Sequence, residues 1–85
     1  MEKIKIRLKA FDFRLLDQTC EKIVNIAQTG SKIIGPLVLP NLKQNQNTIY
    51  KRMIEIINPS VVVIEKLMQM KMSIGIDIEL KQFSK

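Results

Sequence analysis

Histidine and tryptophan are absent from this 85-residue chain, and cysteine occurs once, at Cys20. Without His and with a single Cys, the sequence lacks the ligand sets of structural zinc and iron–sulfur sites, and it can form no internal disulfide. The absence of His also removes the side chain that most often acts as a general base near neutral pH. These absences predict a protein with no metal and no cofactor.

Motifs that supply a catalytic nucleophile are missing as well. The chain has no Ser-x-x-Lys or Gly-x-Ser-x-Gly pattern, and Gly30 and Gly35 are too far apart to form a phosphate-binding loop. Asp77 and Glu79 share one face of a predicted strand, but a solvated face beside lysines explains them better than an acid–base pair. Cys20 lies on an apolar helix stripe, which favours a buried, inert thiol. We therefore expect neither enzymatic activity nor a small-molecule substrate.

Long apolar runs are also lacking. No stretch approaches the roughly 20 residues that a membrane-spanning helix needs, and the start, Met1-Glu2-Lys3, resembles neither a signal peptide nor a transit peptide. No membrane partner is expected, and an organellar version of this chain is expected to be encoded by the organelle itself. With 85 residues and an apolar content of 46%, we predict one domain over residues 1–85.

Basic residues dominate the charge of the chain. It carries 14 Lys and Arg residues against 8 Asp and Glu, which gives a net charge of +6 and an isoelectric point near 9.7. Such a balance favours a polyanionic partner, either nucleic acid or an anionic membrane surface. Because no apolar segment supports the membrane alternative, we favour nucleic acid.

Alternation of residue character indicates the strands. Apolar and basic residues alternate strictly near the N-terminus, so one strand face is buried and the other is wet. The predicted strands span residues 3–10, 32–39, 49–57 and 74–81. In the last of these, the residues expected to point inward are Ile76, Ile78 and Leu80.

Two helices are predicted between these strands. Apolar residues at helical spacing indicate a helix from Phe13 to Thr29, with Asp12 as its N-cap and Gly30 as the glycine just past its end. A second helix follows Asn58-Pro59-Ser60, with Ser60 as its cap. Its expected apolar stripe consists of Val63, Ile64, Leu67 and Met68.

The element order is β-α-β-β-α-β, which is typical of the ferredoxin-like α+β fold with two helices on one face of a four-stranded sheet. In this topology the first and third strands are central, and the fourth lies beside the first. The polar segment 41–48 between the two middle strands is predicted to be an exposed loop.

The basic residues of the first strand admit two interpretations. The fourth strand sets Asp77 and Glu79 beside them, so part of the row is neutralised within the fold, or else the row is free to bind a polyanion. We expect the basic groups near loops to be the least occupied by internal partners, namely Lys9, Arg14, Lys43, Lys51 and Arg52. With the strand residues added, the candidate RNA-binding residues are Lys5, Arg7, Lys9, Arg14, Lys43, Lys51 and Arg52.

Base stacking on the sheet is not expected. RNA-binding domains of this topology stack bases on aromatic residues of the two central strands. Here the outward positions of those strands hold no aromatic residue; they are Lys3, Lys5, Arg7, Lys51, Met53 and Glu55. The sequence therefore predicts contact with the backbone of a folded RNA, which is driven by shape and depends on salt.

A second candidate surface lies between two prolines. Neither proline can donate to a sheet ladder, so this apolar segment, which follows Gly35, is predicted to be a short edge segment leaving a turn. Its flank would then face a partner outside the chain. The candidate protein-interface residues are Pro36, Leu37, Val38, Leu39 and Pro40.

Several blocks of this sequence resemble one protein family. The blocks are residues 4–12 (IKIRLKAFD), 14–18 (RLLDQ), 29–30 (TG), 35–37 (GPL) with 39–40 (LP), 56–60 (IINPS), 67–68 (LM) and 75–79 (GIDIE). Together they are similar to ribosomal protein ten of the small subunit over nearly the whole chain.

Two features depart from the pattern of that family. Asn41 stands where Thr usually follows the second proline, and the long β-hairpin between the second and third strands is shortened over the region 41–49. In the family, the hairpin reaches into the head of the small subunit, and the globular part rests against rRNA and neighbouring proteins. This chain is expected to keep the globular part.

The resemblance implies a structural constituent of the small ribosomal subunit that binds rRNA and neighbouring head proteins and supports translation and tRNA binding. The expected location is the ribosome, in a bacterial cytoplasm or in a mitochondrion or plastid. Bacterial members also pair with a helical Nus-type protein in transcription antitermination, which is the alternative function. A third alternative, a ferredoxin-like domain that binds a small regulatory ligand, lacks a Gly-rich ligand loop.

Overall fold

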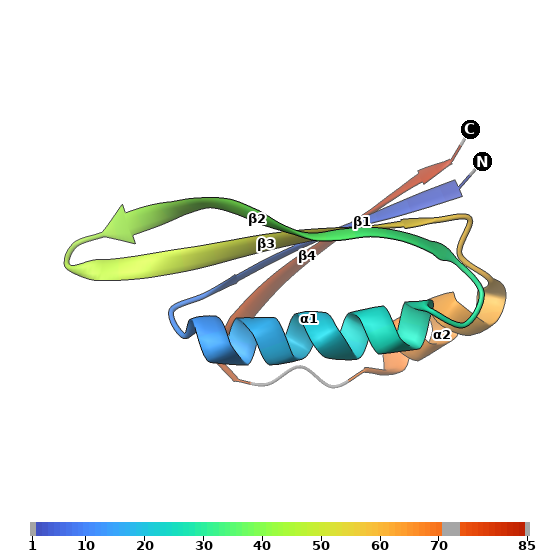
Figure 1. The fold of residues 1–85 in the computed structure, drawn as a ribbon, viewed down its shortest axis with the longest axis horizontal. Helices are drawn as coiled ribbons and strands as arrows, with labels where there is room; N and C mark the ends of the chain where they lie inside the picture. The colour runs from blue at the N-terminus through green and yellow to red at the C-terminus, as the bar shows by residue number, and fades with distance from the viewer. Residues whose placement is uncertain (1, 71–73, 85) are drawn as a thin grey trace.

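The structure, a computed structural model, describes residues 2–70 and 74–84 of the chain. It confirms the predicted order of elements (Figure 1). The elements are β1 (Glu2–Ala10), α1 (Phe13–Ala27), β2 (Lys32–Gln44), β3 (Asn47–Ile57), α2 (Val61–Gln69) and β4 (Ile76–Ser84). The strands form one antiparallel sheet in the order β2-β3-β1-β4, and both helices lie on the same face of it (Figure 1).

The core lies between the sheet and α1. The even-numbered apolar residues of β1 are almost fully buried, and so are Ile54 and Ile56 of β3. They pack against the stripe of α1, which includes Leu16, Cys20 and Ile23. Because side chains alternate across a strand, burying the even residues of β1 turns the odd, basic residues to the other face. We call this second face, which neither helix covers, the open face.

Both predicted N-caps are present. The Asp12 carboxylate accepts a hydrogen bond from the Arg14 amide at 2.9 Å, and the Ser60 hydroxyl accepts one from the Val63 amide at 3.2 Å. Each bond satisfies an amide that has no partner within its helix, which is why these helices begin where the sequence indicates.

The predicted C-terminal cap of α1 is wrong. The helix ends two residues earlier, at Ala27, with Gln28 as a right-handed C-cap, and Gly30 does not have the positive φ of a capping glycine. The Thr29 hydroxyl donates to the Ile26 carbonyl at 3.3 Å instead. This bond satisfies one of the free carbonyls of the last turn, so no left-handed residue is needed.

Two residues that were predicted to point into the core are exposed. Met68 on α2 is 80% exposed and Leu80 on β4 is 47% exposed, whereas Val63, Leu67, Ile76 and Ile78 do contribute to the core. α2 has only nine residues, so it covers less of the sheet than α1 does and leaves these two side chains at the margin.

The segment predicted to be an exposed loop, residues 41–48, forms most of a β-hairpin. β2 continues to Gln44, β3 starts at Asn47, and Asn45 takes a positive φ of 59° in the two-residue turn between them. Figure 1 shows the end of this hairpin projecting past the start of α1. Polar residues suit a strand here because the projecting arm is wet on both faces, so polarity does not distinguish a strand from a loop.

The two prolines of β2 coincide with irregularities in its pairing. β2 is an edge strand, as expected, although it is much longer than predicted. Its register against β3 shifts once between Ile34 and Leu37 and again between Leu39 and Leu42, so each proline falls within a bulge. A bulged residue donates no ladder hydrogen bond, and the strand can therefore hold Pro36 and Pro40 without loss.

Gly35 at the first bulge cannot be replaced without strain. Its φ is +105°, and a Cβ added there would lie 2.8 Å from the Met53 carbonyl oxygen of β3. We predict that Gly35→Ala lowers the free energy of unfolding by about 1–3 kcal/mol, measured by urea denaturation. Gly30→Ala is the control, because its Cβ would meet no atom closer than 3.6 Å. Equal stability of the two variants would contradict this account of the bulge.

Candidate nucleic-acid interface

The strand register gathers four of the seven candidate RNA-binding residues on the open face. Lys5, Arg7 and Lys9 of β1 alternate with buried residues, and Lys9 lies directly opposite Lys51 of the neighbouring strand β3. Arg7, Lys9 and Lys51 line one small depression, together with Glu79. Like charges placed directly opposite each other destabilise a sheet, so an anion bound between Lys9 and Lys51 would relieve a repulsion that already exists in the fold.

Acidic residues neutralise only part of this face. The register sets Asp77 beside Lys9 and Glu79 beside Arg7, as predicted. The ion pairs that form, however, join Glu55 to Lys3 at 2.9 Å and Glu79 to Lys81 at 3.5 Å. Within residues 2–70 and 74–84, no ion pair within 4.0 Å involves any of the four gathered cations. The fourth strand therefore sets carboxylates beside the basic row as expected, but the one ion pair of the row among the described residues joins Lys3 to Glu55 of β3. Binding of a polyanion by the other cations of the row stays a prediction.

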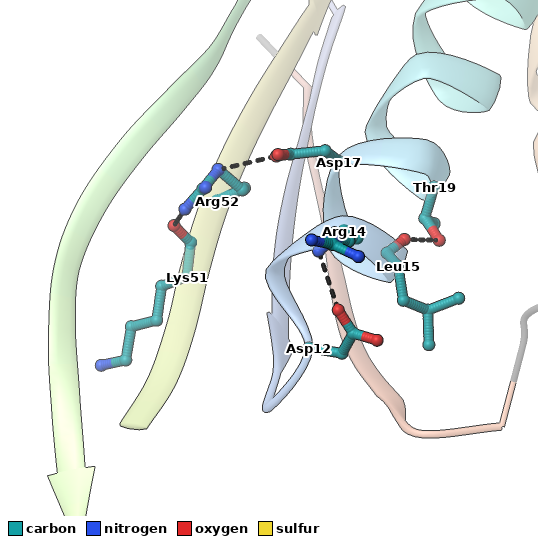
Figure 2. Close-up of polar contacts among 7 residues, drawn as sticks. All are labelled: Asp12, Arg14, Leu15, Asp17, Thr19, Lys51 and Arg52. Carbon is teal, nitrogen blue, oxygen red and sulfur yellow. Dashed lines mark hydrogen bonds and ion pairs between the residues drawn. The ribbon is translucent and has the colours of Figure 1, made fainter. Parts of the chain in front are cut away.

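Arg52 lies on the opposite face of β3 and has partners within the fold. Its Nε donates to the Asp17 carboxylate of α1 at 3.3 Å, and its Nη1 donates to the Lys51 carbonyl at 3.0 Å (Figure 2). The side chain is only 12% exposed. The expectation that Arg52 has no internal partner is wrong, because even-numbered residues of β3 face the helices. Figure 2 shows the Lys51 side chain pointing away from Asp17, toward the other side of the strand.

The remaining two candidate cations are exposed but lie apart from the open face. Arg14 is in the first turn of α1, with its guanidinium carbon 5.8 Å from the centre of the Phe13 ring. Lys43 is near the end of the hairpin and pairs with Thr48, which places it on the helix side of the projecting arm. The seven candidates therefore do not form one patch.

Sequence reasoning missed two residues on or beside the open face. Lys32 pairs with Ile57, which puts its exposed side chain on that face, and the alternation around Ile33 could have indicated this. Phe11 was overlooked because it follows β1 rather than lying within it. Its side chain is 60% exposed.

The candidate protein-interface segment is exposed along the edge of the sheet. Val38 is 71% exposed and Leu37 is 41% exposed, and β2 pairs with β3 alone. Bulges on either side of these residues give an irregular edge, which ordinary strand pairing would not extend readily.

A comparison with protein families adds a finding to this geometry. The model of the family described as ribosomal protein S10p/S20e matches residues 5–49, more than half of the chain. The chain belongs to this family. The match spans most of β1, all of α1 and β2, and the start of β3, and it confirms the resemblance seen in the sequence.

Membership of this ribosomal protein family makes the chain a ribosomal protein, a component of a ribonucleoprotein that acts in translation. Its location is accordingly the ribosome, and its partners are ribosomal RNA and ribosomal proteins. The family consists of structural, non-enzymatic proteins.

In residues 2–70 and 74–84, no group of three or more Cys, Asp or Glu side chains is placed to hold a metal ion. No helix in these two ranges has the length and apolar character needed to cross a membrane. Cys20 is buried on the core side of α1.

Burial controls the chemistry of Cys20. The pKa of its thiol is raised from 9.0 to about 11, chiefly by desolvation and also by the nearby Asp17 carboxylate, while the Arg52 guanidinium acts in the opposite direction. At pH 8 only about 0.1% of the thiol is then ionised, which is roughly a hundredth of the fraction at the ordinary value of 9.0.

We predict that Cys20 reacts with a disulfide reagent at pH 8 at least about a hundredfold more slowly in the native protein than in urea, because only the thiolate attacks. The reaction is followed by absorbance, and the unfolded chain is the control. The pKa of the Cys20 thiol is higher in the folded protein than in the unfolded chain. The free energy of unfolding should therefore fall as the pH rises from about 9 toward 11. Equal rates in both states would show that the thiol is accessible.

Proposed function

We propose that this protein is a structural constituent of the small ribosomal subunit, where it binds rRNA and neighbouring proteins of the head and supports translation and tRNA binding. The observation that carries the proposal is the cluster of Lys5, Arg7, Lys9 and Lys51 on the open face, where no helix covers them. The ribosome in question belongs to a bacterium or an organelle.

The open face suits the phosphate backbone of RNA better than its base edges. Lysine and arginine side chains that project from a sheet place positive charges against RNA phosphates. Such contacts fix the position of the protein on the RNA but do not distinguish one base sequence from another. Lys43 is proposed as a separate phosphate contact on the helix side of the projecting arm. Arg52 is the weakest of the seven candidates, because its guanidinium already pairs with Asp17. Arg14, next to the start of α1, is proposed as a peripheral contact.

The edge of β2 is proposed as the protein-binding surface. Leu37 and Val38 are exposed between Pro36 and Pro40, and they give this edge an apolar patch that water solvates poorly. A neighbouring head protein would bury the patch. The same edge favours the second candidate function, a complex with a helical Nus-type antitermination protein.

Sedimentation distinguishes the two functions. Cell lysate is run on a sucrose gradient, and the protein is located with an antibody. The ribosomal proposal expects it to migrate with small subunits, whereas the antitermination role expects a small heterodimer that survives high salt. A protein found only as a free monomer would contradict both.

The electrostatic part of the proposal sets a salt dependence. If five phosphates contact Lys5, Arg7, Lys9, Lys43 and Lys51, log K for rRNA should fall against log salt with a slope of roughly −3.5 to −4.5. Replacing two of them, in the variant Lys9→Gln/Lys51→Gln, should reduce the steepness of the slope by about 1.4–1.8. Filter binding over a range of salt concentrations measures both values.

The matched control carries the same charge change on the helices. Lys22→Gln/Lys66→Gln alters exposed lysines of α1 and α2, on the covered side of the sheet. We expect its slope to remain close to that of the unmodified protein. Identical slopes for both double variants would mean that only the net charge matters and that the open face has no special role.

The protein-binding edge is tested by placing a charge on it. Val38→Glu should lower incorporation into small subunits in cells, because a carboxylate would be buried against the neighbouring protein. The fold should persist, since Val38 is 71% exposed. Val61→Glu is the control, because this residue is 70% exposed and belongs to α2 rather than to the edge strand. Normal incorporation of the Val38 variant would remove this edge from the interface.

A further inference from the structure

A groove opens where the projecting hairpin passes the end of β1. Phe11 lies on one side, and Leu42 and Ile49 of the hairpin lie on the other. The register pairs Leu42 with Ile49 directly, so the two side chains share the open side of the arm. Phe11 is 60% exposed and Leu42 is 50% exposed. The groove therefore presents an aromatic ring and an aliphatic wall to solvent.

Polar groups line the same groove. Lys9 is at one end, Gln44 reaches it from the hairpin, and Asp77 reaches it from β4. Lys9 supplies a positive charge, the amide of Gln44 supplies both a donor and an acceptor, and the carboxylate of Asp77 supplies an acceptor. Hydrogen-bonding groups of both kinds thus surround an apolar centre, which suits a flat ligand with a polar edge.

The groove continues into the cationic depression of the open face. Lys9 lines both hollows, and the second is also lined by Arg7, Lys51 and Glu79. Across the two hollows, three cations stand against the two carboxylates Asp77 and Glu79. A ligand seated beside Phe11 could therefore continue along Lys9 toward Lys51 as a chain of negative charges.

We propose that this groove binds one unpaired nucleotide of RNA, with its base stacked on Phe11. Unpaired bases are commonly held by an aromatic face and by hydrogen bonds to the base edge, and Gln44 and Asp77 provide the latter. The adjoining phosphates lie along Lys9 and Lys51. This inference deepens the proposed binding of rRNA, on which it rests, and places a stacking site at the end of the sheet rather than on its face.

A nucleotide fits the groove better than a protein segment does. An apolar side chain of a protein would pack against Leu42 and Ile49 but would make no hydrogen bond to Gln44 and no ion pair with the adjoining cations. A strand of RNA would use all of them: a base would contact the ring and the amide, and its phosphates would contact the cations. The charge track leading out of the groove is the feature that favours RNA.

A tryptophan reporter tests the stacking directly. The chain contains no Trp, so Phe11→Trp places a single fluorophore in the groove. Val62→Trp places one at an exposed position of α2, on the side of the sheet that the helices cover. The probe is a single-stranded 12-nucleotide oligoadenylate at low salt. We expect the oligonucleotide to quench the fluorescence of the first variant and to leave that of the second almost unchanged.

Binding affinity provides the second test. Phe11→Leu, which keeps an apolar side chain, should weaken oligoadenylate binding between about fivefold and a hundredfold, the range that corresponds to one stacked base. Its salt slope should match that of the unmodified protein, because no charge is lost. The control Val62→Leu, on the exposed side of α2, should bind normally. A fully paired RNA duplex should show no difference between the unmodified protein and Phe11→Leu. Urea denaturation verifies that each variant folds.

The outcomes separate this inference from the proposed function. If the unmodified protein binds RNA with a steep salt slope but Phe11→Leu binds equally well, the stacking site is wrong and the phosphate surface stands. If the unmodified protein shows no salt-dependent RNA binding, the proposed function fails as well. Equal quenching of the two tryptophan variants would likewise overturn the stacking site.

Discussion

The burial of alternate residues in β1 is the constraint on which the rest of the structure depends. Ile4, Ile6 and Leu8 are at most 2% exposed, and each fully buried side chain of this size contributes about 1.5–3 kcal/mol. A slip of one residue would put lysines into the core and isoleucines into water. The register that protects the core therefore also fixes every cation on the open face, so that stability and charge display arise from one pattern.

The charges on the open face include one repulsive pair, which slightly destabilises the free protein. Lys9 and Lys51 face each other across central strands, and carboxylates near them have not formed the expected ion pairs. A protein selected for stability alone would be expected to place opposite charges there. The repulsion is small, but it makes the free protein a better receptor for a polyanion, because binding relieves it. The hairpin likewise places apolar and cationic side chains beyond the core, where a partner can contact them.

Much of the fold could be predicted from the sequence, because alternation, helix periodicity and capping residues all act locally. Asp12 and Ser60 identified the starts of both helices, and the topology followed from the order of elements. The hairpin escaped prediction because a strand that is wet on both faces has no alternation to detect. The site was predicted in part: Lys5, Arg7, Lys9 and Lys51 share the open face. The alternation of β3 already implied that Arg52 lies on the other face, whereas its contact with Asp17 of α1 could not be read from local sequence. Phe11 depends on the path of a hairpin that lies distant in sequence, so its neighbours could not be read from local pattern.

Lysine protection within assembled small subunits tests the central claim most directly. Free protein and intact subunits are treated with an acetylating reagent, and the modification of each lysine is measured by mass spectrometry. If the open face binds rRNA, Lys5, Lys9 and Lys51 will be strongly protected in subunits, while Lys22 and Lys66 on the helices will be protected less. Protection of the helix lysines with full reactivity on the open face would contradict the account.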